Sequence, residues 1–403
     1  MTSERVNATW GDIATLEYGK ALRNYQESDG EFPVYGTNGP IGFHTAALCK
    51  TPGVVIGRKG AYRGVHYSKK PFFVIDTAFY LKPKVEMDLK WAYYALLAVD
   101  INNMDSGSAI PSTSRDEFYK VAVSFPKLIE QKKIAEFLSC VDDQIELLRE
   151  TNSTLESIAQ VLFKSWFVDF DPVRAKQEGI APEGMDEATA ALFPDGFEET
   201  EMGLVPKGWK VKTIYDIASV TYGAPFASKK FNTEKVGKPL VRIRDLKDEM
   251  PGVYTDEVHP KGYLIQPGDI VVGMDGEFRA YLWGGEPAWL NQRVCVFAPN
   301  QGVPSVFVHR TIVPILARVE ETETATTVIH LGKNDIDRFK VVVPDKPVFE
   351  AFEAITSPLY ARYVKNKQTA QTLSTLRDTL LPRLISGQLR LPEVDSLLEE
   401  SAL

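Results

Sequence analysis

Basic side chains gather around glycine-rich turns in two distant parts of this 403-residue chain. They are Arg58, Lys59, Arg63, Lys69 and Lys70 in the first part, and Arg242, Arg244 and Arg279 in the second. Arginine and lysine on such turns can reach guanine edges and phosphates, and the planar guanidinium carries sequence information through bidentate hydrogen bonds. These residues are therefore candidates for DNA contact. Ordinary solvated charges on loop tips would give the same spacing, so the spacing supports DNA contact and solvated surface charge equally.

Motifs for methyl transfer and for nucleotide binding are missing from the sequence. There is no Asn-Pro-Pro-aromatic or Asp-Pro-Pro-aromatic tetrapeptide, and Asp171-Pro172-Val173, the nearest approach, is expected to end a helix. The run from Gly53 to Gly60 resembles a P-loop, but its spacing is one residue short and no Ser or Thr follows Lys59. We expect a turn there, and no S-adenosylmethionine or nucleotide site in this chain.

Metal and nuclease chemistry are not indicated either. The five histidines show no paired spacing, and Cys49, Cys140 and Cys295 lie far apart, which fits a reducing cytoplasm. Glu130-Gln131-Lys132 resembles half of a nuclease E-x-K motif, yet it stands at a predicted helix start, where a carboxylate suits the helix dipole. We therefore predict no metal site and no catalytic residue.

The net charge of −8 is concentrated in one part of the chain. Residues 128–204 carry 6 Lys/Arg and 17 Asp/Glu, a net charge of −11. Residues 1–127 carry 15 against 13 and residues 205–345 carry 18 against 17, so both are close to neutral. A polyanion would be bound by these near-neutral segments, with extra positive charge from a partner. A solvated acidic surface explains the middle segment equally well.

Length and hydropathy narrow the class of protein. A chain of this length suggests two or three domains. No apolar run approaches the ~20 residues that cross a bilayer, and the N-terminal sequence MTSERVNATW lacks the pattern of a secretion signal. We expect a cytoplasmic protein that does not contact a membrane.

The sequence contains a long internal repeat. Asp12–Gly19, with the sequence DIATLEYG, returns as DIASVTYG at Asp216–Gly223, and a tryptophan precedes each copy. In both halves a Pro-Gly, a short β-branched run and a Gly-x-x-Gly follow. From Pro126 and Pro344 onward the halves align without a gap at an offset of 218, compared with 204 at the start. The second copy therefore holds about fourteen extra residues in its loops.

Each copy begins with short β-branched runs and ends in a pattern typical of a long helix. Apolar residues recur there at alternating steps of three and four. They are Ile134, Leu138, Val141, Ile145, Leu148, Leu155, Leu162 and Trp166, and then Phe352, Leu359, Tyr363, Leu373, Leu376, Leu380 and Leu384. A period of 3.5 predicts a coiled coil in which the two seams bury each other. Pro358 is expected to kink or delay the second helix, and Pro382 to stop or bend it.

These patterns predict an α+β chain with a first globular domain at 1–127 and a second at 207–345. The long helices are placed at 128–171 and 346–390, with a tail at 391–403. The segment 172–206 is acidic, rich in Pro, Gly and Met, and contains short apolar islands. We expect an ordered crossover between the two copies there, although a fully flexible linker remains an alternative.

At this point the sequence resembles a known family, the specificity subunits of type I restriction–modification systems. The resemblance covers essentially the whole chain. It is carried by the domain–helix–domain–helix plan and by four motifs, at Leu162–Val173, Ala190–Pro194, Pro206–Trp209 and Leu380–Gly387. The central and C-terminal motifs are quite specific to the family.

The resemblance implies two target-recognition domains, each reading one half of a split sequence in double-stranded DNA. The two helices would form an antiparallel spacer that sets the gap between the halves. Two modification subunits, which hold S-adenosylmethionine and methylate adenine, would dock on the helices. Restriction subunits with ATP-driven translocase and nuclease activity, and thus a need for Mg, would join them. The specific DNA contacts of the family vary, so none transfers to Arg58 or Arg242.

An antiparallel pair related by a pseudo-twofold axis makes a prediction about two asparagines in the seams. The first helix is centred near residue 150, so positions that sum to about 300 in first-helix numbering should face each other. Asn366 becomes 148 after subtraction of the offset, and 148 and 152 sum to 300. We therefore expect Asn152 and Asn366 to pair inside the seam and to disfavour slipped registers. In the alternative, both amides face solvent.

Two other functional classes compete with DNA recognition. One is a scaffold or inhibitor that uses the same paired-domain fold to bind protein only, and a DNA mobility shift with and without a methyltransferase partner would separate the two. The other is a self-sufficient methyltransferase, which the missing cofactor and catalytic motifs disfavour.

Overall fold

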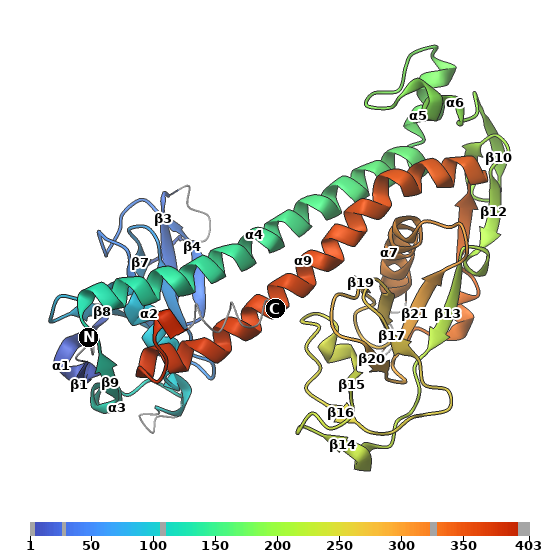
Figure 1. Cartoon of the computed structure of the whole chain (residues 1–403). Helices are drawn as coiled ribbons and strands as arrows, with labels where there is room; N and C mark the ends of the chain where they lie inside the picture. The colour runs from blue at the N-terminus through green and yellow to red at the C-terminus, as the bar shows by residue number, and fades with distance from the viewer. Residues whose placement is uncertain (1–4, 26–29, 105–109, 323–328, 394–403) are drawn as a thin grey trace. The chain divides into compact units, whose positions relative to one another are not determined.

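The computed structural model describes residues 5–25, 30–104, 110–322 and 329–393. The chain divides into two units, the first made of Met1–Ile145 with Leu373–Leu403 and the second of Glu146–Thr372. Each unit holds one globular domain together with part of both long helices (Figure 1). Most of the predicted tail at 391–403 lies outside the described residues.

The described residues of the first unit form three small sheets. A four-stranded antiparallel sheet has the order β2-β8-β5-β6, a three-stranded sheet has the order β4-β3-β7, and β1 pairs with β9. The elements are β1 (Val6–Thr9), α1 (Trp10–Ile13), β2 (Ala14–Tyr18), β3 (Phe32–Gly36), β4 (Gly39–His44), β5 (Gly53–Gly57), β6 (Val65–Ser68), β7 (Phe73–Val74), β8 (Ala78–Pro83), α2 (Leu89–Leu97), α3 (Arg115–Lys120) and β9 (Ala122–Phe125).

The second unit repeats this plan with additional strands. Its four-stranded sheet has the order β13-β21-β18-β19, β12 pairs with β22, and the remaining sheet has the order β14-β16-β15-β20-β17. The strands are β12 (Lys210–Thr213), β13 (Ala218–Tyr222), β14 (Phe231–Asn232), β15 (Lys238–Val241), β16 (Tyr254–Thr255), β17 (Leu264–Ile265), β18 (Ile270–Gly273), β19 (Ala280–Leu282), β20 (Ala288–Leu290), β21 (Val294–Pro299) and β22 (Lys340–Val343). The helices are α7 (Ser305–Thr322) and α8 (Lys333–Ile336).

The repeated DIAxxxYG motif has the same structural role in both units. Asp12 accepts hydrogen bonds from the backbone and hydroxyl of Thr9, at 2.8 and 2.7 Å, and so closes a capping box. Asp216 does the same for Thr213, at 2.9 and 2.8 Å. Such boxes satisfy donors that would otherwise be unpaired at a helix start. The aspartate of the motif therefore has a structural role in both units.

The glycine that ends each motif packs against the backbone of another segment of the same chain. A Cβ on Gly19 would stand 2.0 Å from the Ile75 carbonyl oxygen, and one on Gly223 would stand 2.0 Å from that of Asn291. These distances are far inside van der Waals contact, so only glycine fits at either position. The internal repeat thus marks a close approach between two backbone segments in both halves.

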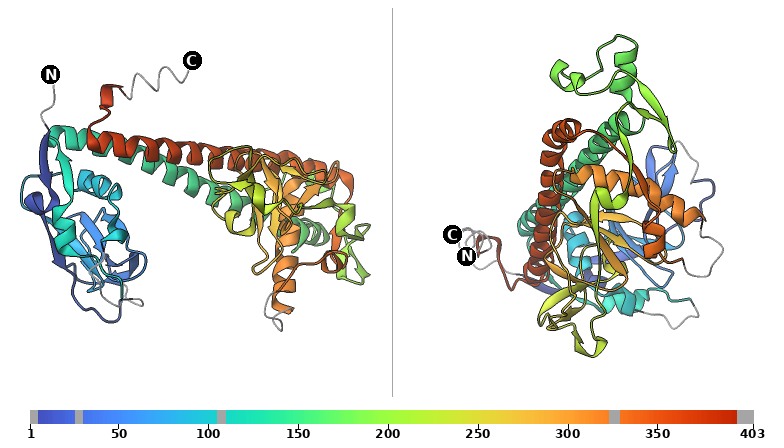
Figure 2. Two further views of the ribbon diagram at one scale, coloured as in Figure 1. Left: turned by 90° about the horizontal axis from the view of Figure 1, so that it is seen from below. Right: turned by 90° about the vertical axis from the view of Figure 1, so that its right-hand side faces the viewer.

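Two long helices, α4 (Leu128–Phe167) and α9 (Lys346–Ser386), contribute to both units. Within the second unit they run antiparallel, because Asn152 contacts Asn366 while the rings of Phe167 and Phe352 are 4.8 Å apart. The two helices lie side by side in both views of Figure 2. They end at 167 and 386, ahead of the predicted 171 and 390, and Asp171-Pro172 begins the short helix α5 (Asp171–Gln177).

The prediction that Pro358 delays α9, or that Pro382 stops it, is wrong, because the helix is continuous from Lys346 to Ser386. A proline inside a helix removes one backbone hydrogen bond and costs about 3 kcal/mol. Buried side chains surround both positions and hold the helix in place. They are Phe352, Thr356 and Tyr360 near Pro358, and Leu380, Leu381 and Leu384 near Pro382. Tertiary packing overrides the local preference here.

The crossover between the copies is folded. It contains α5, α6 (Glu187–Ala191) and a hairpin of β10 (Phe197–Thr200) and β11 (Gly203–Pro206). Phe193 is 1% exposed and packs in the core of the second unit with Trp166 and Trp209. The described part of this segment is an ordered crossover, and a fully flexible linker is excluded.

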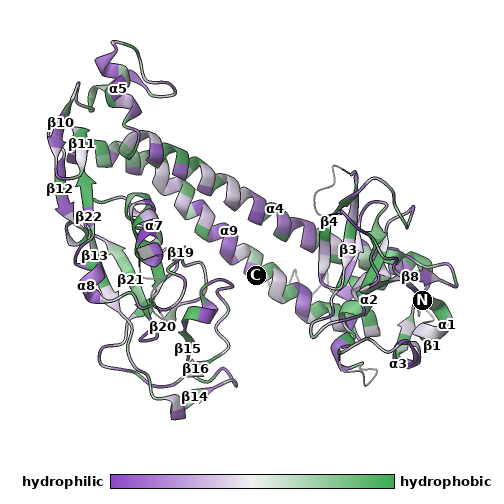
Figure 3. Cartoon of the chain, turned by 180° about the vertical axis from the view of Figure 1, so that it is seen from behind, coloured by the Kyte–Doolittle hydropathy of each residue, from purple (hydrophilic) through white to green (hydrophobic). Residues whose placement is uncertain are grey.

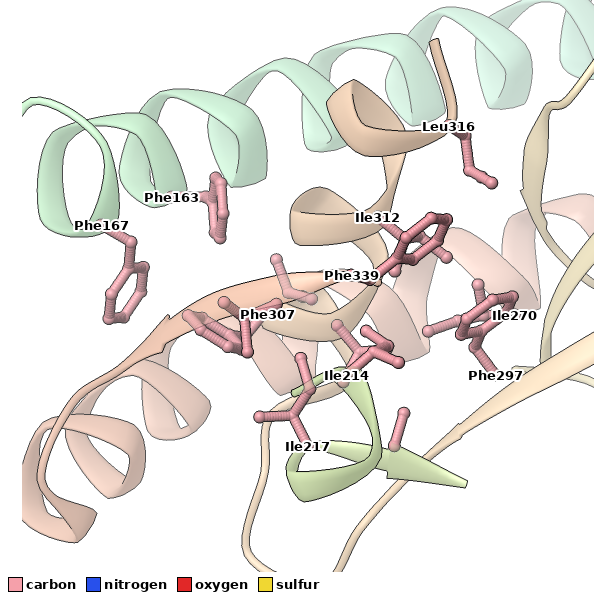
Figure 4. Packing of buried hydrophobic residues seen from close by; sticks show 14 of the residues in the cluster. Phe163, Phe167, Ile214, Ile217, Ile270, Phe297, Phe307, Ile312, Leu316 and Phe339 are labelled. Carbon is pink, nitrogen blue, oxygen red and sulfur yellow. The ribbon is translucent and has the colours of Figure 1, made fainter. Parts of the chain in front are cut away.

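An aromatic core ties α4 to the second globular domain. Phe163 and Phe167 point from α4 toward Phe307 on α7, with ring centroids 5.8 and 4.9 Å from it (Figure 4). Hydrophobic residues also run along β21 and β22, whereas hydrophobic and hydrophilic residues are mixed along α4 and α9 (Figure 3). Such mixing is expected of helices that bury one apolar face.

The predicted contact between Asn152 and Asn366 is present in the second unit. Asn366 Nδ2 donates to Asn152 Oδ1 at 2.9 Å, and Asn152 Nδ2 donates to the Tyr363 carbonyl at 3.0 Å. The two side chains are 8% and 2% exposed, so both amides lie inside the seam. The role of this pair in fixing the register stays a prediction.

Replacing Asn152 with alanine should destabilise the chain by about 1–3 kcal/mol, because the buried Asn366 amide loses its acceptor. Replacing both asparagines with leucine should recover stability while weakening the preference for one register. Urea unfolding of Asn152→Leu, Asn366→Leu and the double leucine variant gives the coupling energy. Additive effects of the two substitutions would show that the pair does not act as a unit.

The buried His309 on α7 makes the stability of the second unit depend on pH. Its Nε2 lies 3.2 Å from the Ala280 carbonyl, and its Nδ1 lies 2.6 Å from the Tyr360 hydroxyl. Burial lowers the pKa of His309 from 6.5 to about 4. The unfolded chain therefore binds a proton between these values that the folded chain does not, so stability falls as pH falls below about 6.5.

At pH 5 this histidine should cost about 2 kcal/mol relative to neutral pH. The charged groups that face it are Arg310, Glu156 and Lys367, and they affect the pKa less than burial does. Thermal unfolding at pH 7.5 and pH 5 should be compared between the wild type and His309→Gln. The variant should lose part of the acid sensitivity, and an identical pH response in both proteins would contradict the assignment.

Candidate nucleic-acid interface

The hairpin of β5 and β6 separates the basic residues predicted in the first unit. Gly53 pairs with Ser68 and Ile56 pairs with Val65, so the strands run antiparallel. Arg58 and Lys59 follow β5 at one end of the hairpin, whereas Lys69 and Lys70 follow β6 at the other. At 3.3 Å per residue, four residues of strand place the two groups about 13 Å apart. The sequence suggested one cluster, and the structure contains two.

At the second end, Lys69 lies against a long helix. Its Nζ is 3.0 Å from a carboxylate oxygen of Asp143 on α4, and both side chains are exposed. Lys70 is exposed beside it. Exposed ion pairs of this kind contribute little to stability.

Arg63 is not at the surface. Its side chain is 4% exposed, and Nη2 donates to the backbone carbonyls of Ile101 and Asn102. Its backbone N–H donates to Asn102 Oδ1 at 2.8 Å. A guanidinium in this position holds the segment 101–103 and does not reach a duplex in this conformation. The spacing of basic residues cannot reveal this, because the loop folds Arg63 inward.

The end of the four-stranded sheet that carries Arg58 also brings together an aromatic residue and a second arginine. The Cζ atoms of Arg58 and Arg115 lie 4.7 and 5.1 Å from the centroid of the Tyr18 ring. Tyr18 ends β2 and is 48% exposed, and Arg115 begins α3. Guanidinium groups near an aromatic ring are held by cation–π attraction. We call Tyr18, Arg58 and Arg115 the arginine–tyrosine cluster.

The loop that presents Arg58 is held by main-chain hydrogen bonds. Arg58 and Lys59 donate backbone N–H groups to the Thr77 carbonyl at 2.9 and 3.2 Å, and Gly60 donates to the carbonyl of Pro111. The Thr113 hydroxyl donates to the Gly57 carbonyl at 2.8 Å. Gly60 has φ of +121°, which few other residues adopt. The loop is therefore part of the framework of the domain.

The run from Gly53 to Gly57 is strand β5, all of it buried between β6 and β8. A P-loop requires exposed backbone N–H groups in an open turn, and this strand offers none. Glu130, from the E-x-K-like motif, pairs with Arg5 at 2.6 Å. Arg5 also donates to the Leu384 and Ile385 carbonyls near the end of α9. Both motifs thus have structural explanations.

In the second unit, two of the three predicted arginines have carboxylate partners. Arg242 Nε lies 3.1 Å from Asp245 in a capping arrangement, and Arg279 Nη1 lies 2.8 Å from Glu320. Arg244 is exposed and has no hydrogen-bond or ion-pair partner in the described part of the chain. Of the three, Arg244 is the arginine most available to an anionic ligand.

The loop after β18 is the counterpart of the loop after β5. Lys59 forms a β-bridge with Ser112, and Asp275 forms one with His330. At this position the second unit has an acidic residue and a different set of contacts. His330 Nδ1 lies 2.6 Å from Asp275 Oδ1, and Arg293 Nη1 lies 3.5 Å from the same oxygen. The two units therefore present different side chains at the same place in the fold.

Five lysines of the second unit escaped the sequence-based prediction. They are Lys229, Lys230, Lys235, Lys238 and Lys261. All five are exposed around strands β14 to β17, and none has an ion-pair partner among the described residues. The arrangement suits contact with a phosphate backbone. In the sequence these lysines form a lysine-rich stretch. The sequence-based prediction missed them because it relied on basic residues beside glycine-rich turns.

No metal site is found in the part of the chain that the structure describes, where no three His, Cys, Asp or Glu side chains are grouped to hold an ion. Over the same residues, no helix is long and apolar enough to cross a membrane.

Comparison with known proteins identifies the two repeated halves. The family described as "Type I restriction modification DNA specificity domain" matches residues 3–157 and again residues 206–383. The two matches together cover most of the chain. The chain belongs to this family.

Relatives of known name are specificity subunits of type I restriction enzymes. That of MjaIX from Methanocaldococcus jannaschii is 26% identical over 329 residues, which span 77% of this chain and 72% of the relative. That of HindI from Haemophilus influenzae is 24% identical over 339 residues, which span 69% and 71%. The crystal structure of the S subunit of a type I system from M. genitalium is 18% identical, with a TM-score of 0.59 over 95% of this chain and 96% of that one. The last likeness confirms the fold of a specificity subunit.

Proposed function

We propose that this specificity subunit reads a bipartite DNA sequence, with one half-site assigned to each globular domain. The observation that carries the proposal is the duplication of the DNA specificity domain at 3–157 and 206–383. Both copies have the same order of strands in the four-stranded sheet, but they differ in the side chains beside it. Two similar domains with different surfaces suit two different half-sites separated by unread base pairs.

The chain would act as the recognition component of a larger assembly. We propose that two modification subunits dock on the long helices and the acidic crossover, and that restriction subunits join them. The helices have exposed apolar side chains that suit such docking. Those on α4 are Ile129, Leu147, Ile158 and Val161. The crossover adds Ile180 and Leu192, which are 58% and 39% exposed.

The chemistry would belong to the partners. We propose that this chain has no active site, and that S-adenosylmethionine, ATP and Mg are bound by the modification and restriction subunits. The two motifs that resemble catalytic sequences support this view, because Gly53–Gly57 forms a buried strand and Glu130 pairs with Arg5. The compartment would be the cytoplasm, where the partners meet chromosomal DNA.

The decisive experiment maps methylated adenines in cells that express this subunit with its modification partner. The expected result is a motif of two short sequences separated by a fixed gap. Methylation at one short uninterrupted motif would overturn the bipartite reading. A DNA mobility shift with and without the partner distinguishes DNA recognition from a scaffold that binds protein only. The purified chain alone should not turn over S-adenosylmethionine.

Replacing Arg58 and Lys59 with alanine should weaken only the half-site that the first unit reads. Loss of an arginine that contacts a base or phosphate costs about 1–3 kcal/mol, or roughly 5- to 150-fold in binding. Methylation rates should be measured on oligonucleotides with a single change in either half-site. Lys50→Ala, at an exposed lysine of the same unit outside the loop after β5, is the matched control. An equal loss of methylation rate at both half-sites, or no loss, would show that Arg58 and Lys59 are ordinary surface charges that do not contact the first half-site.

A further inference from the structure

The arginine–tyrosine cluster holds the Arg115 side chain from several directions. Its Cζ lies 5.1 Å from the Tyr18 centroid and 5.7 Å from the Tyr119 centroid. Its Nε donates to the Tyr119 hydroxyl at 3.3 Å. That hydroxyl also accepts the backbone N–H of Leu16 at 3.0 Å, so it is fixed to β2. Arg115 is a long, flexible residue that this packing has made rigid.

The packing leaves hydrogen-bond donors for a ligand. A guanidinium carries five N–H donors. One of them, on Nε, donates to Tyr119. The Tyr18 side chain contributes most to raising the pKa of Arg115 above its ordinary value. Donors on the terminal nitrogens remain, and the side chain is only half-buried. A fixed fork of donors at a half-open surface suits a planar pair of acceptors.

The second arginine determines the kind of ligand. Arg58 lies near the same ring and uses Nη1 to donate to the Asp76 carbonyl at 3.0 Å. Two positive charges within about 5 Å of one ring repel each other, and a polyanion bound beside them would offset that repulsion. The ligand should therefore combine negative charge with a planar acceptor edge. DNA offers both, through its phosphates and through O6 and N7 of guanine in the major groove.

We propose that Arg115 reads a guanine in the half-site of the first unit, and that Tyr18 is the positioning residue that holds it. This inference rests on the proposed function, because it names the base that the first domain recognises. Arginine bidentate to guanine is the arrangement that a fixed guanidinium serves best. Tyr119 fixes Nε, so the side chain keeps one orientation toward the base.

The described residues of the second unit do not form a counterpart of the arginine–tyrosine cluster. In the first unit the backbone N–H of Thr113 donates to the Arg58 carbonyl. In the second unit Leu331 donates to the Met274 carbonyl in the same way, so Met274 is the counterpart of Arg58. The first helical residue after the corresponding cap is Lys333, where the first unit has Arg115. The hydroxyl of Tyr222, the counterpart of Tyr18, is buried. The guanine contact is therefore specific to the first half-site.

The test replaces Arg115 with lysine in the full chain, co-expressed with its modification partner. Lysine keeps the positive charge but loses the planar fork. Methylation rates on oligonucleotides that vary one base pair at a time should show relaxed discrimination, by about 10- to 100-fold, at one G·C pair of the first half-site. All other positions should keep their preference. Arg23→Lys is the matched control, because Arg23 is an exposed arginine of the same unit that lies outside the cluster.

Tyr18 provides a second, independent test. Tyr18→Leu should relax the same G·C pair, and Tyr18→Phe should restore most of the discrimination, because the ring and its attraction for the guanidinium remain. A merely structural role would lower stability and the methylation rate at every position without changing base preference. Circular dichroism and thermal unfolding of each variant show whether the fold is kept.

The outcomes separate this inference from the proposed function. A wild-type complex that methylates no bipartite motif would overturn both. A bipartite motif whose base preferences are unchanged in Arg115→Lys and Tyr18→Leu would overturn the guanine contact alone. Relaxation at an A·T pair, or equal weakening at all positions as expected for a phosphate contact, would also overturn it.

Discussion

Replacing Gly223 with alanine is expected to cost more than about 3 kcal/mol, because overpacking against a fixed main chain cannot be relieved by a side-chain shift. The new Cβ would stand 2.0 Å from the Asn291 carbonyl oxygen, at the end of β13. That cost is a large part of the 5–15 kcal/mol that stabilises a typical domain. Urea unfolding should show a lower midpoint, or a second unit that no longer folds.

Gly252→Ala is the matched control in the same unit. Nothing lies within 4 Å of a Cβ built at Gly252, and its φ is one that alanine can adopt. Its stability should be unchanged or slightly increased, because alanine restricts the unfolded chain. Equal effects of the two substitutions would show that close approach is not the reason for glycine in the repeated motif. Gly19→Ala should damage the first unit in the same way.

Replacing Phe167 with alanine should destabilise the chain by about 3–5 kcal/mol, the range for large-to-small changes at buried aromatic positions. Phe167 is 8% exposed and lies at the end of α4 among six other aromatic side chains. These are Phe163, Trp166, Trp209, Phe307, Phe349 and Phe352. Alanine would leave a cavity where α4, α7, α9 and the second domain meet. Thermal unfolding measures the loss.

The neighbouring residue supplies the control for this substitution. Val168 is 53% exposed, so Val168→Ala removes apolar surface that is already in water and should change stability by less than about 0.5 kcal/mol. A small effect of Phe167→Ala, close to that of Val168→Ala, would mean that the ring cluster contributes little to stability. A lower rate of methylation at both half-sites should accompany the instability of the Phe167 variant.

The long-range organisation of the chain could be predicted from the sequence, because periodic patterns report it directly. The repeat and the 3.5-residue seams predict two similar domains and two paired helices, and the subtraction of one offset placed Asn152 opposite Asn366. Such arguments depend on symmetry and helical geometry, which local packing does not alter. The positions of Pro358 and Pro382 show the limit, because burial of neighbouring residues overrode their helix-breaking tendency.

The candidate site was harder to predict, because it depends on how loops fold. Arg58 and Arg115 are 57 positions apart in the sequence. The pairing of β2 with β8 and of β8 with β5 brings Arg58 to Tyr18, and the contact of Tyr119 on α3 with Leu16 on β2 brings Arg115 there. Arg63 is close to Arg58 in sequence but is turned inward to the segment 101–103. Clusters of basic residues in the sequence show that a segment is basic. Which of their side chains come together in space depends on how the strands pair.

The matching bridges of Lys59 with Ser112 and of Asp275 with His330 have an evolutionary consequence. The main chain is anchored in the same way in both units, while the anchored side chains differ in charge. Under the proposed function, substitution within these loops would change what is recognised without altering the fold that presents them. Each half could then diversify on its own.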